Sequence, residues 1–247
     1  MIHLKNNYEI EKLYRAGQVV KNTLFLLEES IKPGITTLDL DYIAEEYIKS
    51  EKCIPGFKGL YGYPSTLCVS VDDEVVHGLP KKELLKEGQI IGIDVGAIYD
   101  GYYGDHAKTF YVGEVSSEAK KLVETTKRSL EIGIENAVEN GHIGDIGYAI
   151  QKYAESKGYS VVRELVGHGI GSKLHEEPQV PNYGDQHTGP KIEVGMCLAI
   201  EPMINLGSPE IYTKNDNWTV CTKDGKISAH FEHSIAITEK GTKILTK

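Results

Sequence analysis

Apolar side chains near the start of the chain recur at the spacing of an amphipathic helix. Over residues 8–31 they fall close to every 3.6 positions, so one face of this helix would be buried. Asn6 or Asn7 can cap its start, and a Pro-Gly pair follows its end. A second helix is expected to begin at Thr36 or Thr37, because the apolar positions after them keep the same period.

Short β-branched runs alternate with turn residues in the rest of the chain. Two more helices are expected between residues 117 and 158, with a break near Asn140-Gly141. No low-complexity segment or linker interrupts these elements, so we predict one α/β (α+β) domain over residues 1–247. The predicted strands cover 67–71, 90–98, 106–112, 161–166, 196–204, 218–222 and 233–238.

Four pairs of segments in the chain resemble each other in the same order. Chance would explain any one pair, but four in order indicate an internal duplication. We predict halves at approximately 8–115 and 116–247 that face each other at their acidic strand ends. The repeat would set His77 where His168 stands in the second half, so both should reach one cavity from opposite sides. The matching pairs are 38–51 with 144–157, 75–78 with 166–169, 87–94 with 193–201, and 105–106 with 232–233.

Two aspartates are expected on one face of a β-hairpin. Asp100-Gly101 is typical of a two-residue turn, and it would place Asp105 opposite Gly96. Side chains alternate along a strand, so Asp94 shares the face of Gly96 and becomes a diagonal neighbour of Asp105. Two carboxylates there repel each other unless a cation neutralises them, which favours a metal site. The alternative is that one of them points to solvent beside the turn.

The second half of the chain supplies three more candidate ligands. His168 lies between glycines, where little shields the ring. Glu201 ends an apolar strand before a proline, and Glu232 stands where another strand begins. Four carboxylates and one imidazole form an oxygen-rich set, which suits Mn, Fe or Co better than a thiolate zinc site would. Four acidic ligands indicate two ions, about 3.5–4 Å apart, that activate a water and polarise a carbonyl.

Charge and cysteine content narrow the class of protein further. The net charge of −9 argues against a nucleic-acid surface, which needs clustered Lys and Arg. The four cysteines are widely spaced with no C-x-x-C pair, which favours a reducing compartment. The N-terminal region has no apolar core of a signal peptide, and no early apolar run could span a bilayer. We therefore expect a cytoplasmic protein with no membrane partner.

The five candidate ligands and their surroundings carry a family resemblance. Together with HGIGSKLHEEPQV and AIEPM, they closely resemble type I methionine aminopeptidase over essentially the whole chain. The resemblance implies a single catalytic domain of the pita-bread fold, with two pseudo-twofold halves and a central antiparallel sheet flanked by helices. It implies removal of the initiator methionine before a small second residue, by attack of a metal-bridging hydroxide on the scissile carbonyl. The ligand set is Asp94, Asp105, His168, Glu201 and Glu232.

The resemblance also implies cofactors, partners and individual roles. Two divalent ions per chain are expected, from Co, Mn, Fe, Zn or Ni. Asp94 and Glu232 would bracket both ions, and Glu201 would also accept the proton of the attacking water. His175 would hydrogen-bond the scissile carbonyl, and His77 would lie near the scissile amide nitrogen. The expected partners are peptide and nascent-protein N-termini, with transient proximity to the ribosome, and a monomer is expected.

The methionine pocket matches the family only in part. Tyr63, Cys68 and Trp218 stand at pocket positions, and aromatic or apolar walls suit a thioether. The alternative for these residues is ordinary core packing. For Cys68, burial statistics favour core packing and a pocket role about equally. The residues that depart from the familiar bacterial pattern are Phe57, Leu60, Leu174 and, beside a ligand, His230.

Three other functions fit the sequence less well. An aminopeptidase P or prolidase shares the five-ligand pattern but typically carries a large additional N-terminal domain. A non-catalytic binding protein of this fold has no reason to keep all five ligands and both accessory histidines. Type II methionine aminopeptidase is disfavoured, because 30 residues between Glu201 and Glu232 leave no room for its inserted subdomain.

Overall fold

The first two helices begin where side-chain caps satisfy their free N–H groups. The computed structural model describes residues 1–247. Helix α1 (Asn7–Ser30) is capped by Asn6, whose side chain accepts from the second and third N–H groups of the helix. Helix α2 (Thr37–Ser50) is capped by Thr36, whose side chain accepts from the third N–H, that of Asp39. In both helices an acidic third residue accepts the N–H of the cap in return, so both form capping boxes.

A long antiparallel hairpin forms the sheet of the first half. Strands β4 (Ile90–Tyr99) and β5 (Tyr102–Tyr111) pair along their full length without a bulge. The short strand β1 (Ile54–Pro55) and strand β2 (Leu67–Val71) pair with the other edge of β4. Apolar side chains of α1 and α2 pack on this sheet in a buried cluster of 17 residues, which keeps the hairpin rigid.

The second half repeats this arrangement with another helix pair and sheet. Helices α3 (Ser117–Asn136) and α4 (Ile143–Ser156) are separated at the predicted Asn140-Gly141 break. They pack on the strands in a buried cluster of 22 residues. The sheet has the order β15-β14-β9-β7-β8. These strands are β7 (Gly167–Gly169), β8 (Glu176–Val180), β9 (Cys197–Ile200), β14 (His233–Thr238) and β15 (Gly241–Ile244).

Two smaller sheets and one 3-10 turn complete the fold. One sheet has the order β13-β10-β6, and the other has the order β11-β12-β3. In the second of these, β3 from the first half pairs with β12 from the second, which joins the halves. The elements are β3 (Glu74–Val76), β6 (Ser160–Val161), β10 (Met203–Asn205), β11 (Ile211–Thr213), β12 (Val220–Thr222), β13 (Ser228–His230) and η1 (Leu60–Gly62).

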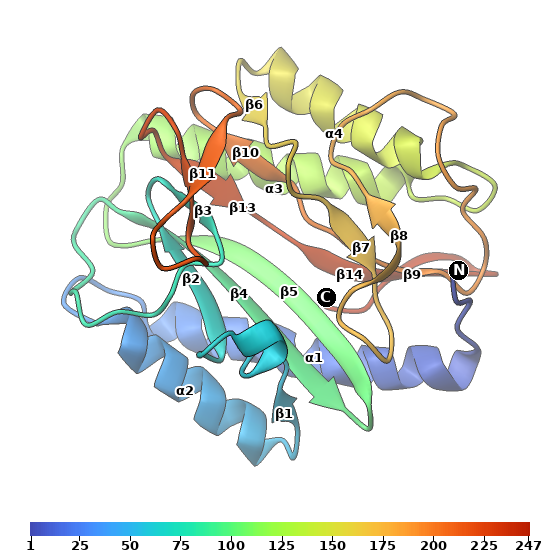
Figure 1. The fold of residues 1–247 in the computed structure, drawn as a ribbon, viewed down its shortest axis with the longest axis horizontal. Helices are drawn as coiled ribbons and strands as arrows, with labels where there is room; N and C mark the ends of the chain where they lie inside the picture. The colour runs from blue at the N-terminus through green and yellow to red at the C-terminus, as the bar shows by residue number, and fades with distance from the viewer.

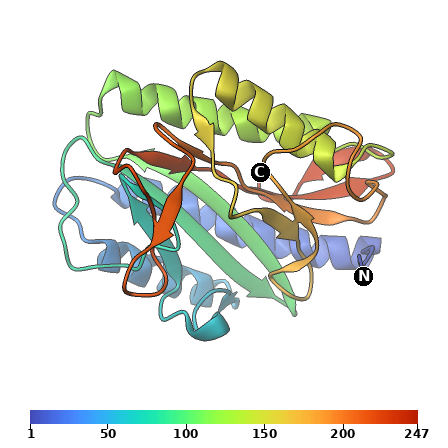
Figure 2. The same ribbon diagram turned by 45° about the horizontal axis from the view of Figure 1, so that its top comes forward.

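The two helix pairs lie on opposite outer sides of the strands. In Figure 1, α1 and α2 lie below the sheets, and α3 and α4 lie above them; Figure 2 shows the same layers after rotation. Every strand ladder is antiparallel. None of the helices combines the length and the apolar character needed to cross a bilayer. The strands of both halves thus meet between the two helix layers.

The structure corrects three details of the sequence interpretation. The strand expected at 161–166 is paired only as far as Val161. The strand expected at 196–204 is interrupted at Glu201-Pro202, because proline has no N–H to give to a ladder. The expectation that His77 takes the place of His168 is wrong. His168 lies in β7, which pairs with β9. The corresponding pair in the first half is β2 with β4, whereas His77 follows β3, which pairs with β12.

Candidate active site

The β4–β5 hairpin holds the first two carboxylates in the predicted register. Asp105 lies opposite Gly96, and Asp94 lies opposite Ala107. Because the ladder has no bulge, Asp94 and Asp105 share a face, as expected from the Asp-Gly turn. Asp105 is 4% exposed, and Oδ1 of each aspartate is buried without a hydrogen-bond partner. The predicted hairpin geometry is confirmed.

The two glutamates come together because two neighbouring strands break at the same level. The β9–β14 ladder ends at the pair Ile200 and His233, and the β10–β13 ladder resumes at the pair Met203 and His230. Glu201 lies in the first break and Glu232 in the second. Because neither residue is part of a ladder, their side chains need not follow the alternating pattern of a strand. Hydrogen bonds hold the second break against β5, with the Glu232 N–H donating to the Ala107 carbonyl at 2.9 Å.

His168 faces this carboxylate group from β7. Its Nε2 lies 3.5 Å from Glu201 Oε1 and 3.7 Å from Asp105 Oδ2. One donor atom each from Asp105, His168 and Glu232 lie within 4.8 Å of one another. His168 Nδ1–H donates to the Gly169 carbonyl at 2.9 Å, which leaves the Nε2 lone pair directed at the carboxylates. This is the tautomer that a metal ligand needs.

The four carboxylates lie in surroundings that oppose their ionisation. Burial raises the pKa of Asp94, Glu201 and Glu232 well above the ordinary range, and neighbouring carboxylates raise each of them further. Burial also raises the pKa of Asp105 to about 7. Glu232 Oε1 is buried without a partner, as are the two aspartate Oδ1 atoms. Asp105, His168 and Glu232 form a close donor set that a divalent cation fits, because it would neutralise the repulsion of the carboxylates; Asp94 and Glu201 lie outside this closest group.

The two accessory histidines line the same cavity as the candidate ligands. His77 and His175 remain accessible, but the surrounding protein desolvates both rings and lowers their pKa, that of His77 to about 4. The imidazole rings of His175 and His168 pack edge to face, with 4.5 Å between their centroids. His77 has φ +58°, a left-handed conformation that is uncommon outside glycine and is often found at functional sites. The expectation that His77 and His168 reach one cavity is confirmed.

A narrow apolar pocket of about 140 Å³ adjoins the carboxylates. The Tyr63 hydroxyl lies 2.9 Å from two backbone carbonyl oxygens, and its ring packs edge-on against Trp218 at 5.0 Å. Cys68 lies directly opposite Asp94 in the β2–β4 ladder. A larger groove of about 680 Å³ shares His77, His168, His175 and Glu201 with this pocket. The pocket lining is Phe57, Leu60, Tyr61, Tyr63, Cys68, His77, Asp105, His168, Leu174, His175, Glu201, Trp218 and Glu232.

Three further residues beside this site had no assigned role in the sequence interpretation. Buried His230 places Nε2, which has no hydrogen-bond partner, 3.8 Å from Glu201 Oε2. Asn182 donates to the Glu201 backbone carbonyl at 3.1 Å. The Tyr61 ring stacks on His175, with 5.9 Å between centroids. His230 was visible in the sequence as an unusual neighbour of Glu232, whereas no sequence pattern indicates that Asn182 or Tyr61 lies here.

A buried ion pair anchors the segment that carries His175. Lys5 is 4% exposed, and its Nζ lies 2.7 Å from Glu176 Oε2. The other carboxylate oxygen of Glu176 accepts the Lys173 N–H at 3.1 Å. Lys5 N–H also donates to the Gly195 carbonyl at 2.7 Å. The N-terminal segment thus ties the loop before β8 to the start of β9.

Removing the cation of this pair should destabilise the protein strongly. We expect Lys5→Met to lower the free energy of unfolding by about 3 kcal/mol, because it leaves a largely buried carboxylate without its partner. Urea unfolding followed by circular dichroism measures the change. In the comparison pair, Lys108→Met should cost less than about 1 kcal/mol, since the side chains of Lys108 and Glu28 are 35% and 50% exposed. Equal losses in both variants would contradict an anchoring role for Lys5.

Comparisons with known proteins agree on one family. The model of metallopeptidase family M24 matches residues 11–239. A protein of Clostridium acetobutylicum named methionine aminopeptidase is 51% identical over 247 residues, covering 100% of this chain and 99% of the relative. The crystal structure of a methionine aminopeptidase from Thermotoga maritima superposes with a TM-score of 0.97 at 47% identity and covers all of both chains.

A proline-directed enzyme shares the fold at a greater distance. The structure of a prolidase from Pyrococcus furiosus has a TM-score of 0.79 at 20% identity. The alignment covers 99% of this chain but only 65% of that one. At this level of identity the similarity concerns the fold alone.

Proposed function

This chain belongs to the methionine aminopeptidases of metallopeptidase family M24, and we propose which of its residues bind metal, bind substrate and move the proton. The fold and the enzyme class expected from the sequence are confirmed by this membership. The protein is a metallo-exopeptidase that hydrolyses the bond after an N-terminal methionine. Its metal is divalent, as the family requires.

One observation carries the metal assignment. Donor atoms of Asp105, His168 and Glu232 lie within 4.8 Å of one another, and Asp94, Asp105 and Glu232 each have a buried carboxylate oxygen without a hydrogen-bond partner. We assign the ligands as Asp94, Asp105, His168, Glu201 and Glu232. Four carboxylates and one imidazole would suit two ions of the Mn, Fe, Co, Ni or Zn group, which Asp94 and Glu232 would help to hold together with the other three ligands. When bound, such ions supply Lewis acidity and a water of lowered pKa.

The chain's own groups then handle the proton and the scissile amide. Glu201 faces both the pocket and the groove, so its carboxylate is placed to accept a proton from the attacking water. His175, neutral near pH 7 because its pKa is lowered, donates a hydrogen bond to the scissile carbonyl. His77, which lines the same cavity, would contact the scissile amide nitrogen.

The apolar pocket is the proposed site for the methionine side chain. Its walls of Tyr63, Cys68 and Trp218 are supplemented by Phe57 and Leu174, both buried. Aromatic and thiol groups suit a flexible thioether, because sulfur makes favourable contacts with ring edges. Leu60 lies at the rim of this wall, partly buried. The rest of the peptide would leave through the larger groove, where a small second residue fits closest to the two histidines.

A peptide assay tests this function against the proline-directed alternative. After chelation, the protein should release no methionine from Met-Gly-Met-Met, and divalent ions added back singly should restore release. A peptide Xaa-Pro without methionine should not be cleaved, because the pocket is shaped for a long thioether. Met-Leu-Met-Met reports on the preference for a small second residue and should be cleaved at least about 10-fold more slowly. Preferential cleavage of Xaa-Pro would overturn the assignment.

The setting of the reaction is also part of this proposal. The substrates are the N-termini of peptides and nascent proteins in the cytoplasm, and the working unit is a monomer. All proposed ligands and pocket residues come from one chain, so the site needs no second copy. Transient proximity to the ribosome stays a prediction.

A further inference from the structure

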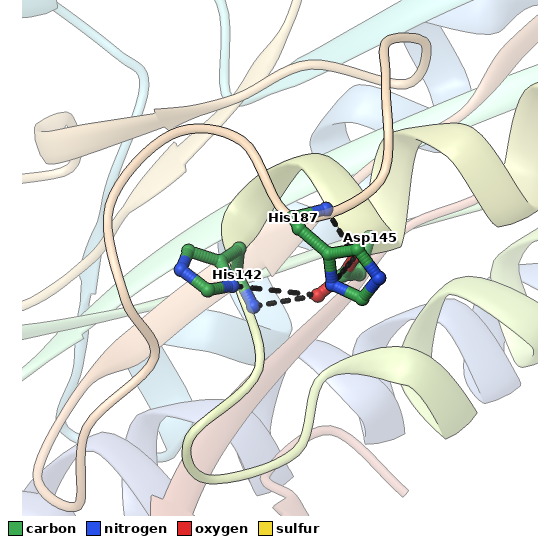
Figure 3. A group of neighbouring side chains, drawn as sticks. All are labelled: His142, Asp145 and His187. Carbon is green, nitrogen blue, oxygen red and sulfur yellow. Dashed lines mark hydrogen bonds and ion pairs between the residues drawn. The ribbon is translucent and has the colours of Figure 1, made fainter.

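A second group of potential ligands lies apart from the candidate active site. His142 precedes α4, Asp145 lies in its first turn, and His187 comes from the loop between β8 and β9. None of the three lines the pocket or the groove described above. Figure 3 shows both imidazole rings directed toward the carboxylate of Asp145. The function of the enzyme leaves this group unexplained.

The donor atoms are spaced closely enough to share one ion. His187 Nδ1 lies 3.6 Å from Asp145 Oδ1, and His142 Nδ1 lies 3.9 Å from Asp145 Oδ2. One donor atom from each residue lie within 4.8 Å of one another. Metal–ligand bonds of about 2.0–2.2 Å place the donors of a tetrahedral ion roughly 3.4 Å apart. Small rotations of the two rings would close the site.

The backbone around these side chains is already fixed. The Asp145 carboxylate accepts the N–H of His142 at 2.7 Å and the N–H of His187 at 2.8 Å. The same loop meets the helix through Gly144, whose N–H donates to the Thr188 carbonyl at 3.0 Å. A Cβ on Gly144 would lie 2.5 Å from the Asp185 carbonyl oxygen, so only glycine allows this contact. Both histidines are therefore held beside one carboxylate before any ligand arrives.

Helix capping alone does not account for the arrangement. A cap requires only the bond from the His142 N–H to Asp145; the bond from the His187 N–H ties the loop to the helix. These hydrogen bonds, that of His187 first, lower the pKa of Asp145 below its ordinary value. A cap does not require two imidazoles with Nδ1 atoms near the same two oxygens. Each oxygen keeps a second lone pair for a cation. The positive end of the α4 dipole opposes a cation, but the ionised carboxylate offsets it.

We propose that His142, Asp145 and His187 form a second binding site for one borderline divalent transition-metal ion, with Zn²⁺ as its representative. Two imidazoles and one carboxylate match the ligands that such ions take, whereas Mg²⁺ and Ca²⁺ prefer sets made of oxygen alone. Three protein ligands leave one position for water, and the exposed His187 makes the site accessible. The ion would clamp the loop before β9 onto the start of α4.

Metal counting on the full-length protein tests this site. Chelated protein is dialysed against Zn²⁺ in the background Glu232→Ala, so that the central carboxylate set is weakened in every sample. We expect His187→Ala to bind one ion fewer than this background. Gln186→Ala, an exposed neighbour in the same loop, should bind as many ions as the background. His142→Asn should lose the same ion, because it removes a second ligand while keeping the backbone bond.

Spectroscopy and activity locate the lost ion. Zn²⁺ should shift the imidazole ¹⁵N resonances of His142 and His187 in the background protein, and should leave those of His142 unmoved when His187 is alanine. In the otherwise unchanged enzyme, His187→Ala should retain methionine release within about two-fold, since this residue contacts neither cavity. Equal ion counts in His187→Ala and its background, or unshifted His142 resonances, would overturn the proposal. The Glu232→Ala background separates this outcome from any failure of the central metal assignment.

Discussion

Replacing Glu232 with alanine should abolish methionine release, by at least about 1,000-fold in kcat/KM. Glu232 is 1% exposed, and its Oε1 points into the carboxylate group without a hydrogen-bond partner. In the proposed centre it is a ligand, so its loss would misplace or release a metal ion. Release of Met from Met-Gly-Met-Met, with metal content measured on the same samples, checks this result.

The same substitution should leave the metal-free fold at least as stable as the parent. Without metal, Glu232 is a buried acid beside Asp105, Glu201 and Asp94. Burial is the largest cause of its raised pKa, and these three neighbouring carboxylates raise the pKa further. Removing it relieves that repulsion. Glu239→Ala is the matched control, because Glu239 is exposed beyond the end of β14 and should change neither property. Near-normal activity in Glu232→Ala, or collapse of its metal-free fold, would contradict the assignment.

The pH dependence of the metal-free protein follows from the same raised pKa values. Burial raises the pKa of Asp105 to about 7 in the folded state, against about 3.9 in an unfolded chain. Below the unfolded value both states are protonated, and the group has no effect on stability. As pH rises toward 7, the unfolded state loses its proton first, so the folded state becomes relatively less stable.

Asp105→Asn should reverse this loss in the metal-free protein. The asparagine variant should be more stable than the parent by ~2–4 kcal/mol at pH 8, and the gain should vanish near pH 4. Urea unfolding in the presence of a chelator measures both values. With metal present the order should invert, because the parent gains binding free energy that the variant lacks. A stability difference independent of pH would argue against a buried, metal-free carboxylate cluster.

Local patterns were sufficient to predict the first pair of ligands. The Asp100-Gly101 turn fixes the hairpin register, and period-two alternation then places Asp94 and Asp105 on one face. The start of α1 could be predicted to within one residue, at Asn6 or Asn7, because the partners of a cap lie within three residues. In each case the interaction depends on a short stretch of chain whose geometry is nearly invariant.

Features that depend on the packing of distant segments do not follow from local patterns. The side-by-side position of Glu201 and Glu232 requires two strand breaks to coincide, which no single segment encodes, so its prediction depended on the family resemblance. The Lys5–Glu176 pair joins residues 171 positions apart. The mistaken equivalence of His77 and His168 has the same origin, because similar short sequences do not determine which strands they pair with: β3 pairs with β12, and β7 pairs with β9.

His175→Ala should lower kcat by about 100- to 1,000-fold while metal content stays that of the parent. Its ring lies between Tyr61 and His168, at 5.9 and 4.5 Å between centroids, so it is oriented toward the cavity without being one of the converging ligand atoms. A hydrogen bond that strengthens as charge develops on the carbonyl oxygen affects the transition state more than substrate binding, so KM should change much less than kcat.

Two further variants separate this role from a structural one. His175→Gln keeps an N–H donor and should recover part of the lost kcat, whereas His3→Ala removes another histidine on the groove and should leave kcat near that of the parent. A purely structural role would instead lower the stability of both His175 variants and leave no advantage to glutamine. Metal loss as the main effect of His175→Ala would assign the residue to the metal centre, because only a group that stabilises the developing oxyanion lowers kcat with the ions still bound.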